Sequence, residues 1–273
     1  SRGPPHIFDD GRVPNRISRF FGSDPPESPH VAAIAAVRPR PSRPRSPENS
    51  IGLCFFRINL PTEFKFQAIQ MEQLVGSLAN SLDRIAYEII GNEFELYFQF
   101  VAAERQRDLL ARQLRAHLPE FDIRSVSDGL ADVEMATFDN SIVVPFGLAD
   151  HWFRPIPNGQ ELGADPLIPL VGALDGLKNG EIACVQVMFS RTRYPWQRSI
   201  RERLFDTQGK ASYPSLTDQI KGIRQKLSDP LAAVSVRLWV KSSDRTAPSQ
   251  IARQIMPYFK QFGGVGSNTL VPL

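Results

Sequence analysis

Residues 84–126, RIAYEIIGNEFELYFQFVAAERQRDLLARQLRAHLPEFDIRSV, are the stretch of this chain that decides its fold. Gly91-Asn92 has the chemistry of a tight hairpin turn between two strands. After the turn, apolar and polar side chains alternate with the period of a strand that buries one face. The apolar members of this alternation are Phe94, Leu96, Phe98 and Phe100, and the polar members are Glu95, Tyr97 and Gln99. The stretch therefore opens as strand, turn and strand.

The second half of the stretch predicts a helix and then a further strand. The charged run 104–108 opens the helix, and Leu110, Leu114 and Leu118 recur every four residues, which gives the helix one apolar stripe. Pro119 ends the helix, because proline cannot continue it. The whole stretch is thus a ββαβ unit, and it holds no catalytic constellation.

The residues before this stretch complete a larger module. Residues 51–60 are apolar and strand-like, and a helix is predicted near 67–82 because its apolar side chains fall on one helical face. These side chains are Met71, Leu74, Val75, Leu78 and Leu82. The element order over 51–126 becomes β-α-β-β-α-β, which is the ferredoxin-like pattern of an antiparallel sheet with two helices on one face.

Residues 127–273 predict a second and more elaborate copy of this order. The expected strands are 133–138, 142–146, 181–192, 233–240 and 270–273, and the expected helices are 165–177, 196–205, 215–228 and 250–262. Asp165-Pro166 starts the first of these helices, with an N-cap followed by proline in the first turn. The helices between about 196 and 228 form an insertion inside the copy. The two copies share no sequence identity, so the repeat is one of architecture.

Composition separates residues 1–50 from the rest of the chain. They are rich in Pro, Arg and Ser, so they have too few apolar groups to offset the entropy of ordering. We interpret them as an extended tail or linker. The predicted fold class is therefore α+β, with two ferredoxin-like βαββαβ modules, 51–126 and 127–273, behind a Pro/Arg-rich tail.

Composition also limits the functions that this chain can have. The net charge is only +3, so the molecule as a whole is not a polycation. Cys54 and Cys184 lie in apolar runs and are expected to be small buried thiols, which fits a reducing cytosol. No apolar run is long enough to span a bilayer. Because the chain begins with Ser, we expect a processed or excised product, with room for a membrane anchor or a further domain outside it.

The sequence offers no recognisable catalytic, cofactor or metal site. A phosphate-binding loop needs G-x-x-x-x-G-K-[ST], and the nearest segment, 263–269, lacks the lysine and follows a helix. None of the four histidines has metal-ligand spacing to another His, Cys or carboxylate. The acidic run between Asp128 and Asp139 is expected to be solvated, because acid–base work needs a desolvated cleft. We therefore expect no enzyme activity in this chain.

One basic segment is a candidate surface for nucleic acid or an acidic partner. Arginines cluster around two aromatic residues in RTRYPWQRSIRER, a combination that suits phosphate contact and cation–π stacking. The candidate residues are Arg191, Arg193, Tyr194, Trp196, Arg198, Arg201 and Arg203. A helix that carries these arginines and Glu202 could equally be a solvated or intramolecular face, and the pattern alone favours that alternative.

A set of short segments runs in order through residues 51–273. They are Phe56–Pro61, Met71–Leu74, Tyr87–Gly91, Leu96–Phe98, Arg107–Leu109, His117–Glu120, Asp165–Leu167, Pro169-Leu170, Gly180-Glu181, Gln186-Val187, Val236–Leu238 and Phe259–Phe262. Together they resemble the region that precedes the ATPase core in bacterial type IV secretion and conjugation ATPases of the HerA/FtsK-type superfamily. The family's Walker motifs are missing here, so its ATPase activity is not carried over. The arginine-rich loop after Phe189 also departs from the family.

The resemblance implies that this chain is the N-terminal portion of such a motor protein. Its expected role is that of a non-catalytic accessory domain, which docks the motor to a channel or to sister subunits and helps to hold DNA. The expected partners are other machinery subunits, copies of itself and DNA. The expected location is the cytoplasm, at the inner face of the membrane. Contact with the membrane itself is expected only through segments outside this chain. The alternative is a stand-alone nucleic-acid-binding or protein-interaction module, with Tyr97, Gln99 and Val101 on an open sheet face.

Overall fold

The computed structural model describes most of the chain from Gly52 onward. The described residues are 52–59, 68–81, 83–127, 140–157, 167–178, 180–192, 196–206, 208–210, 212, 219–228, 230–263 and 267–273. The predicted tail at 1–50, the predicted strand at 133–138 and the Asp165-Pro166 helix start lie outside the described residues. None of the described helices is long and apolar enough to cross a membrane.

The first half of the described chain has the predicted order of elements. It contains β1 (Leu53–Asn59), α3 (Ala68–Ser81), β2 (Ile85–Asn92), β3 (Leu96–Ala103), the 3-10 turn η1 (Glu104–Gln106), α4 (Arg107–His117) and β4 (Asp122–Val126). The helices predicted at 67–82 and after 104 are confirmed as α3 and α4. Helix α4 buries Leu110 and Leu114 of the predicted apolar stripe.

The second half contains two helices between strands that pair with each other. It contains β5 (Ser141–Leu148), α5 (Ile168–Leu174), β6 (Ile182–Arg191), α6 (Trp196–Leu204), α7 (Ile220–Ser228), β7 (Ala232–Lys241), α8 (Ala247–Lys260) and β8 (Leu270–Pro272). Because β6 and β7 pair directly, α6 and α7 form an insertion between them, as predicted. The helix that was expected to reach Leu177 ends at Leu174, since Asp175 and Gly176 continue as a turn.

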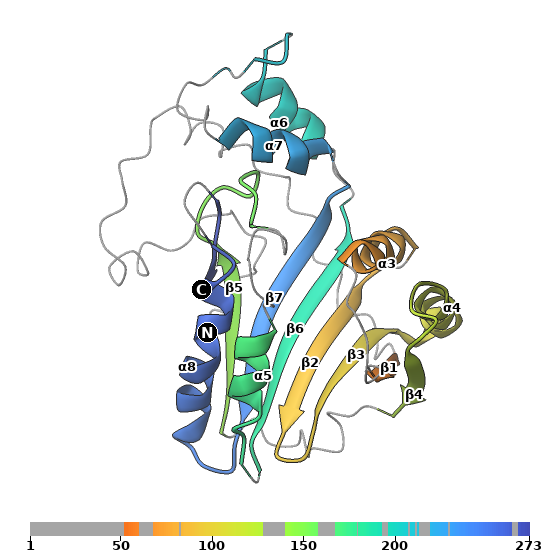
Figure 1. Ribbon diagram of the computed structural model, residues 1–273, viewed down its shortest axis with the longest axis vertical. Coiled ribbons are helices and arrows are strands. Elements are labelled where there is room, and N and C mark those ends of the chain that lie inside the picture. Colours follow the sequence, from red (N-terminus) through yellow and green to blue (C-terminus); the bar gives the residue numbers. More distant parts are fainter. Residues whose placement is uncertain are drawn as a thin grey trace, which may run out of the picture.

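All eight described strands form one antiparallel sheet in an α+β fold. Its strand order is β4-β1-β3-β2-β6-β7-β5-β8 (Figure 1). The two halves of the chain meet where β2 pairs with β6, in eight residue pairs from Ile85↔Phe189 to Asn92↔Ile182. The sheet therefore runs without a break from one half of the chain to the other.

Four helices cover one face of this sheet. Figure 1 shows α3, α4, α5 and α8 along the sheet. Leu74 of α3, Leu110 of α4, Leu170 of α5 and Ile255 of α8 are fully buried in the same apolar cluster as Phe100 of β3. The two apolar clusters on the opposite face draw their described members from strands only. One large core thus lies between the helices and the sheet, and the other face is helix-free among the described residues.

The prediction that β3 buries only one face is wrong. Phe98 and Phe100 pack toward the helices, but Tyr97, Gln99 and Val101 on the helix-free face are also buried, at 5%, 0% and 7% exposure. Side chains of the neighbouring strands cover these residues: the Arg57 guanidinium carbon lies 3.8 Å from the centre of the Tyr97 ring, and Val101 packs with Phe55 of β1. Burial raises the pKa of Tyr97 to about 12.

The hairpin turn lies two residues later than Gly91-Asn92. Strand β2 continues through Asn92, whose backbone N–H donates to Glu95 O at 3.1 Å. The Asn92 side chain then caps the turn, because its Oδ1 accepts the N–H groups of Phe94 at 2.8 Å and Glu95 at 2.9 Å. Phe94 is therefore a turn residue with 86% exposure, not the buried strand residue that the alternation predicts.

A row of polar side chains crosses the helix-free face at the junction of β2 and β6. Glu88 is only 3% exposed, and its carboxylate accepts hydrogen bonds from Gln99 Nε2 at 2.6 Å and from Gln186 Nε2. Arg237 Nε donates in turn to Gln186 Oε1 at 2.5 Å. A buried carboxylate is costly unless it is hydrogen-bonded, so these contacts favour this one register of β2 against β6.

Close packing of α5 on the sheet requires a glycine in β2. A Cβ at Gly91 would lie 2.9 Å from Leu174 Cβ, which is closer than carbon atoms approach each other in proteins. Leu174 itself is buried in the large core. The absent side chain at Gly91 thus sets the distance between α5 and the sheet.

We predict that Gly91→Ala lowers the free energy of unfolding by about 1–3 kcal/mol, because α5 must move away from the sheet. Gly172→Ala is the matched control, since Gly172 lies in α5 and an added Cβ meets no atom within 4 Å. It is expected to be neutral or to stabilise by up to about 1 kcal/mol through helix propensity. Urea denaturation of both variants measures the difference, and equal effects would contradict the proposed packing.

Candidate functional site

The helical insertion has a small core of its own. Helix α6 buries Ile200 and Leu204, and α7 buries Ile223 and Leu227, each pair one turn apart on its helix. Phe153, from the segment that follows β5, is 1% exposed in the same cluster. The insertion therefore packs on the segment after β5 and forms a compact unit at one end of the sheet (Figure 1).

The structure describes five of the seven candidate surface residues. Arg191 is the last residue of β6 and is exposed, and Trp196 is the half-buried first residue of α6. Arg198, Arg201 and Arg203 are exposed on α6. Arg193 and Tyr194 lie outside the described residues. The described candidates thus lie together on α6 and at the strand end that leads into it.

Three of these five residues make contacts within the insertion or with the segment after β5. The Trp196 ring lies 5.8 Å from the Trp152 ring, and Arg198 Nε pairs with Glu202 Oε1 at 2.9 Å in the exposed face of α6. Arg201 Nη2 donates to the carbonyl of Leu227 at 2.6 Å, which satisfies an acceptor near the carboxyl end of α7. The intramolecular alternative therefore accounts for part of the basic segment.

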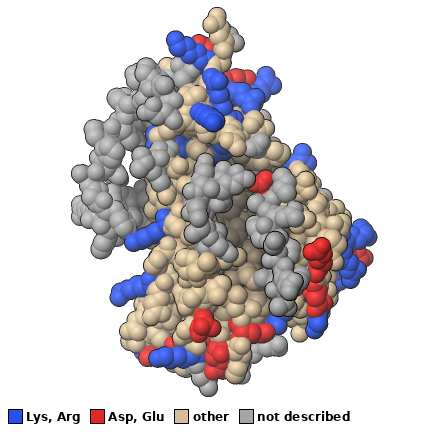
Figure 2. Space-filling model, viewed as in Figure 1, with Lys and Arg blue, Asp and Glu red and all other residues tan. Residues whose placement is uncertain are grey.

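The insertion still carries a large excess of positive charge. Its described residues between 196 and 228 include seven cations and two carboxylates. Three of the cations, Lys210, Lys221 and Arg224, are exposed residues that the motif search missed. Figure 2 shows the Lys and Arg side chains gathered over this end of the molecule. For Lys221 and Arg224 the signal in the sequence was the solvent side of the predicted helix 215–228, opposite its apolar stripe.

A cavity of about 510 Å³ lies between the two helices of the insertion. Phe205 and Leu227, both buried, form its apolar part. The exposed part of its lining is charged and consists of Arg201, Glu202, Asp206 and Arg224, with Gly209 beside them. An apolar floor with a charged rim suits an apolar side chain of a partner that also carries charge.

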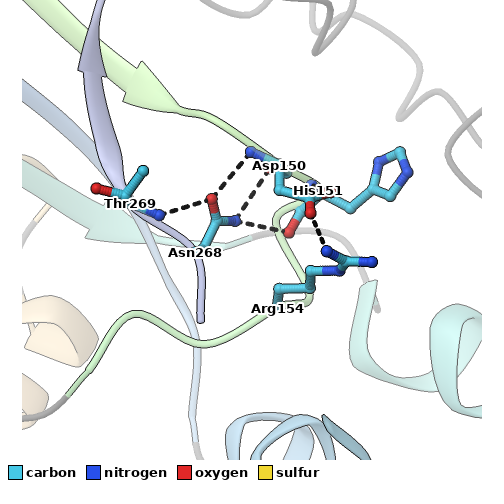
Figure 3. Close-up of polar contacts among 5 residues, drawn as sticks. All are labelled: Asp150, His151, Arg154, Asn268 and Thr269. Carbon is cyan, nitrogen blue, oxygen red and sulfur yellow. Dashed lines mark hydrogen bonds and ion pairs between the residues drawn. The ribbon is translucent and has the colours of Figure 1, made fainter. Parts of the chain in front are cut away.

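Asn268 joins the segment after β5 to the start of β8 (Figure 3). Its Oδ1 accepts the N–H groups of Asp150 at 2.9 Å and Thr269 at 3.0 Å, and its Nδ2 donates to the carbonyls of Asp150 at 3.0 Å and His151 at 2.9 Å. Asn268 is 1% exposed, and these four bonds use its full capacity. Asp150 also pairs with Arg154, while the His151 imidazole points away from the network. The geometry is that of a structural clamp.

Lys226 of α7 holds the insertion against the same segment. Its Nζ donates to the carbonyl of Trp152 and to that of Arg154, the latter at 3.1 Å. Burial lowers the pKa of Lys226 to about 8, because a charged ammonium is disfavoured away from water. Residues 149–157 are thus fixed to the sheet by Asn268 and to the insertion by Lys226.

The structure describes both cysteines, whereas the acidic run from Asp128 to Asp139 lies outside the described residues. Cys54 and Cys184 are buried free thiols, as predicted, and burial raises the pKa of both. Within the described ranges, no group of three or more His, Cys, Asp or Glu side chains is placed to hold a metal ion. The charged surface of the insertion is therefore the best-supported candidate site.

Comparison with known proteins assigns no family to this chain. No protein-family model matches its sequence, and no curated protein matches it either. The likeness to secretion and conjugation ATPases thus stays a prediction based on the ordered segments of the sequence.

We predict that Asn268→Ala lowers the free energy of unfolding by about 2–4 kcal/mol, because it leaves buried N–H and C=O groups without partners. Asn59→Ala is the matched control, since the Asn59 side chain makes an exposed bond to Asp122. That change is expected to cost less than about 1 kcal/mol. Thermal and urea unfolding give both values, and a loss no larger than the control would contradict the clamp.

We predict that Lys226 makes stability increase with pH between about 8 and 10.5. In this window the unfolded chain holds the lysine proton, with its ordinary pKa of 10.5, while the folded chain has released it at about 8. Lys226→Met should remove this slope, whereas Lys221→Met, an exposed change on the same helix, should leave it. Urea unfolding across this pH range tests the prediction, and parallel profiles for all three proteins would contradict it.

Proposed function

We propose that this chain is a non-catalytic accessory domain of a type IV secretion or conjugative DNA-transfer ATPase. In this role it docks the motor to a channel or to sister subunits and helps to hold DNA. The observation that carries the docking and DNA-holding role is the basic helical insertion, which is fixed at one end of a continuous sheet. The assignment to this class of motor protein rests on the ordered segments of the sequence that resemble it.

The order of the strands supports the predicted division into two ferredoxin-like modules. Each half has the order β-α-β-β-α-β, and the spatial orders β4-β1-β3-β2 and β6-β7-β5-β8 repeat the same arrangement on either side of the β2–β6 junction. We infer that the halves are two ferredoxin-like modules, 51–126 and 127–273, joined through equivalent strands. Such a joined sheet is a rigid base on which one projecting element can meet a partner.

The insertion is a better candidate for holding DNA than the sheet face. Nucleic acids bound on an open sheet stack their bases on exposed aromatic side chains. Tyr97, Gln99 and Val101 are buried, so they do not offer such a platform. Arg191, Arg203 and Lys221 are exposed cations, and cations of this kind contact phosphate without regard to sequence.

The proposed role also defines where the chain works and with what. A docking domain of this class acts in the cytoplasm at the inner face of a membrane, and its partners are machinery subunits, copies of itself and DNA. It needs no cofactor of its own. Purified chain is expected to show no ATP turnover, and turnover that accompanies the folded protein would overturn the non-catalytic assignment.

We predict that the triple change Arg191→Ala, Arg203→Ala and Lys221→Ala weakens DNA binding. Fluorescence anisotropy with single- and double-stranded oligonucleotides in a salt series is the measurement. Loss of three phosphate contacts should reduce the slope of log affinity against log salt by up to about 3.

The control for this experiment removes the same charge elsewhere. Arg112→Ala, Arg115→Ala and Arg253→Ala change exposed arginines on α4 and α8, away from the insertion. These changes are expected to leave most of the binding intact. If the two triple variants bind DNA equally well, the insertion is not the DNA-binding surface.

A further inference from the structure

The turn between β2 and β3 exposes a large aromatic side chain between two carboxylates. Phe94 is 86% exposed, the highest value among the exposed large apolar residues described. Glu93 and Glu95 are its neighbours in the chain. An aromatic side chain left in water is an unused source of binding free energy, and aromatic residues are the commonest anchors of protein interfaces.

This turn is held in one conformation. Asn92 Oδ1 accepts the N–H groups of Phe94 and Glu95, and the Asn92 N–H donates to Glu95 O. The Glu95 carboxylate is bound by Arg57 Nη1 at 3.0 and 3.2 Å. Because the turn is already ordered, binding through Phe94 would cost little conformational entropy.

The cavity between α6 and α7 complements this turn in polarity and charge. The cavity as a whole, about 510 Å³, has room for an aromatic side chain. Phe205 and Leu227 are its apolar residues, and two arginines, Arg201 and Arg224, stand at its rim beside Glu202 and Asp206. Arg224 lies over the Phe205 ring with its guanidinium carbon 5.1 Å from the ring centroid. A side chain that enters the cavity therefore meets apolar surface below and positive charge around the entrance.

The two arginines keep their charge toward the entrance. Arg201 donates to the carbonyl of Leu227 and Arg224 to that of Gly209, and neither acceptor carries a net charge. Of the two carboxylates of the lining, Glu202 pairs with Arg198. Asp206 keeps its charge, because its Oδ1 accepts the neutral backbone N–H groups of Gln208 and Lys210. Two arginines against one carboxylate without a cationic partner leave the rim with a small positive excess. The rim thus favours an acidic partner.

The exposed turn and the cavity lie at opposite ends of the sheet (Figure 1). Asn92, at the turn, pairs with Ile182, the first residue of β6, and the insertion starts only after Arg191, the last residue of that strand. Ten residues of extended strand span roughly 30 Å. Phe94 therefore cannot enter the cavity of its own chain, so a contact between the two must join different copies.

We infer that the cavity of one copy binds the Phe94 turn of a second copy. Phe94 fills the space over Phe205 and Leu227, and Glu93 approaches Arg201 and Arg224, while Glu95 stays paired with Arg57. Such a head-to-tail contact joins two different surfaces, so repetition gives a closed ring or an open helical chain. The inference deepens the proposed function, on which it rests, by assigning the contact between sister subunits.

The first test is self-association of the full 273-residue chain. Sedimentation velocity over a concentration series from about 1 μM to about 1 mM should show association that weakens as salt rises. Phe94→Ala should weaken it at least about tenfold, the loss typical of a truncated aromatic anchor. Ile168→Ala removes another exposed apolar side chain, on α5, and should leave association unchanged.

A mixing experiment tests the head-to-tail geometry. Arg224→Glu reverses charge at the cavity but leaves the turn intact, whereas Phe94→Ala removes the anchor but leaves the cavity intact. At a concentration where wild type is associated, each variant alone should associate at least about tenfold more weakly. An equimolar mixture should form a dimer that grows no further, because only one productive contact is possible. Circular dichroism and melting temperatures verify folding, and Arg224→Gln, a milder change, should weaken association in the same direction.

Several outcomes would overturn the inference. They are a monomeric wild type at every concentration, association of Phe94→Ala as strong as that of wild type, and a mixture that stays monomeric. A cavity variant that loses DNA binding but keeps its self-association would assign the cavity to nucleic acid. None of these results depends on ATP turnover or on the DNA-binding variants, so the proposed function can fail or succeed separately.

Discussion

The pairing of β2 with β6 is the constraint on which the rest of this molecule depends. Eight consecutive residue pairs join the two halves, and Glu88 and Gln186 lie opposite each other near the middle. A shift by one residue would move Glu88 to the helix side, into the apolar core, at a large cost. The buried carboxylate thus helps to hold the two halves in one register.

A single register gives the molecule two ends of different character. One end carries the insertion with its excess of cations, and the other carries the turn with Glu93, Phe94 and Glu95. The strands between them set the separation, because a hydrogen-bonded strand changes little in length. The insertion and the β2–β3 turn are therefore held at a fixed distance and orientation, whichever of them binds a partner.

The sequence predicted individual helices and strands better than the contacts between them. Helices such as α4 were legible because Leu110 and Leu114 repeat with the helical period. The bond between Glu88 and Gln186 links residues 98 positions apart, and local patterns contain no trace of it. Phe94 was misplaced because it continues the alternation of β3, whereas the Asn92 side chain ends the strand. Lys221 and Arg224 were overlooked because their place on one surface depends on how α7 docks against Phe153.

The insertion leaves and re-enters the sheet at neighbouring points. Arg191 and Ala232 face each other in the ladder, and Thr192 Oγ1 donates to Leu231 O at 3.2 Å just beyond it. Forty residues of chain between them can thus change in length or sequence without disturbing the strand register. Such an element can be replaced by another during evolution while the sheet that carries it stays the same. Proteins that share this sheet can therefore differ in the partner that they bind at that end, with the same apolar core.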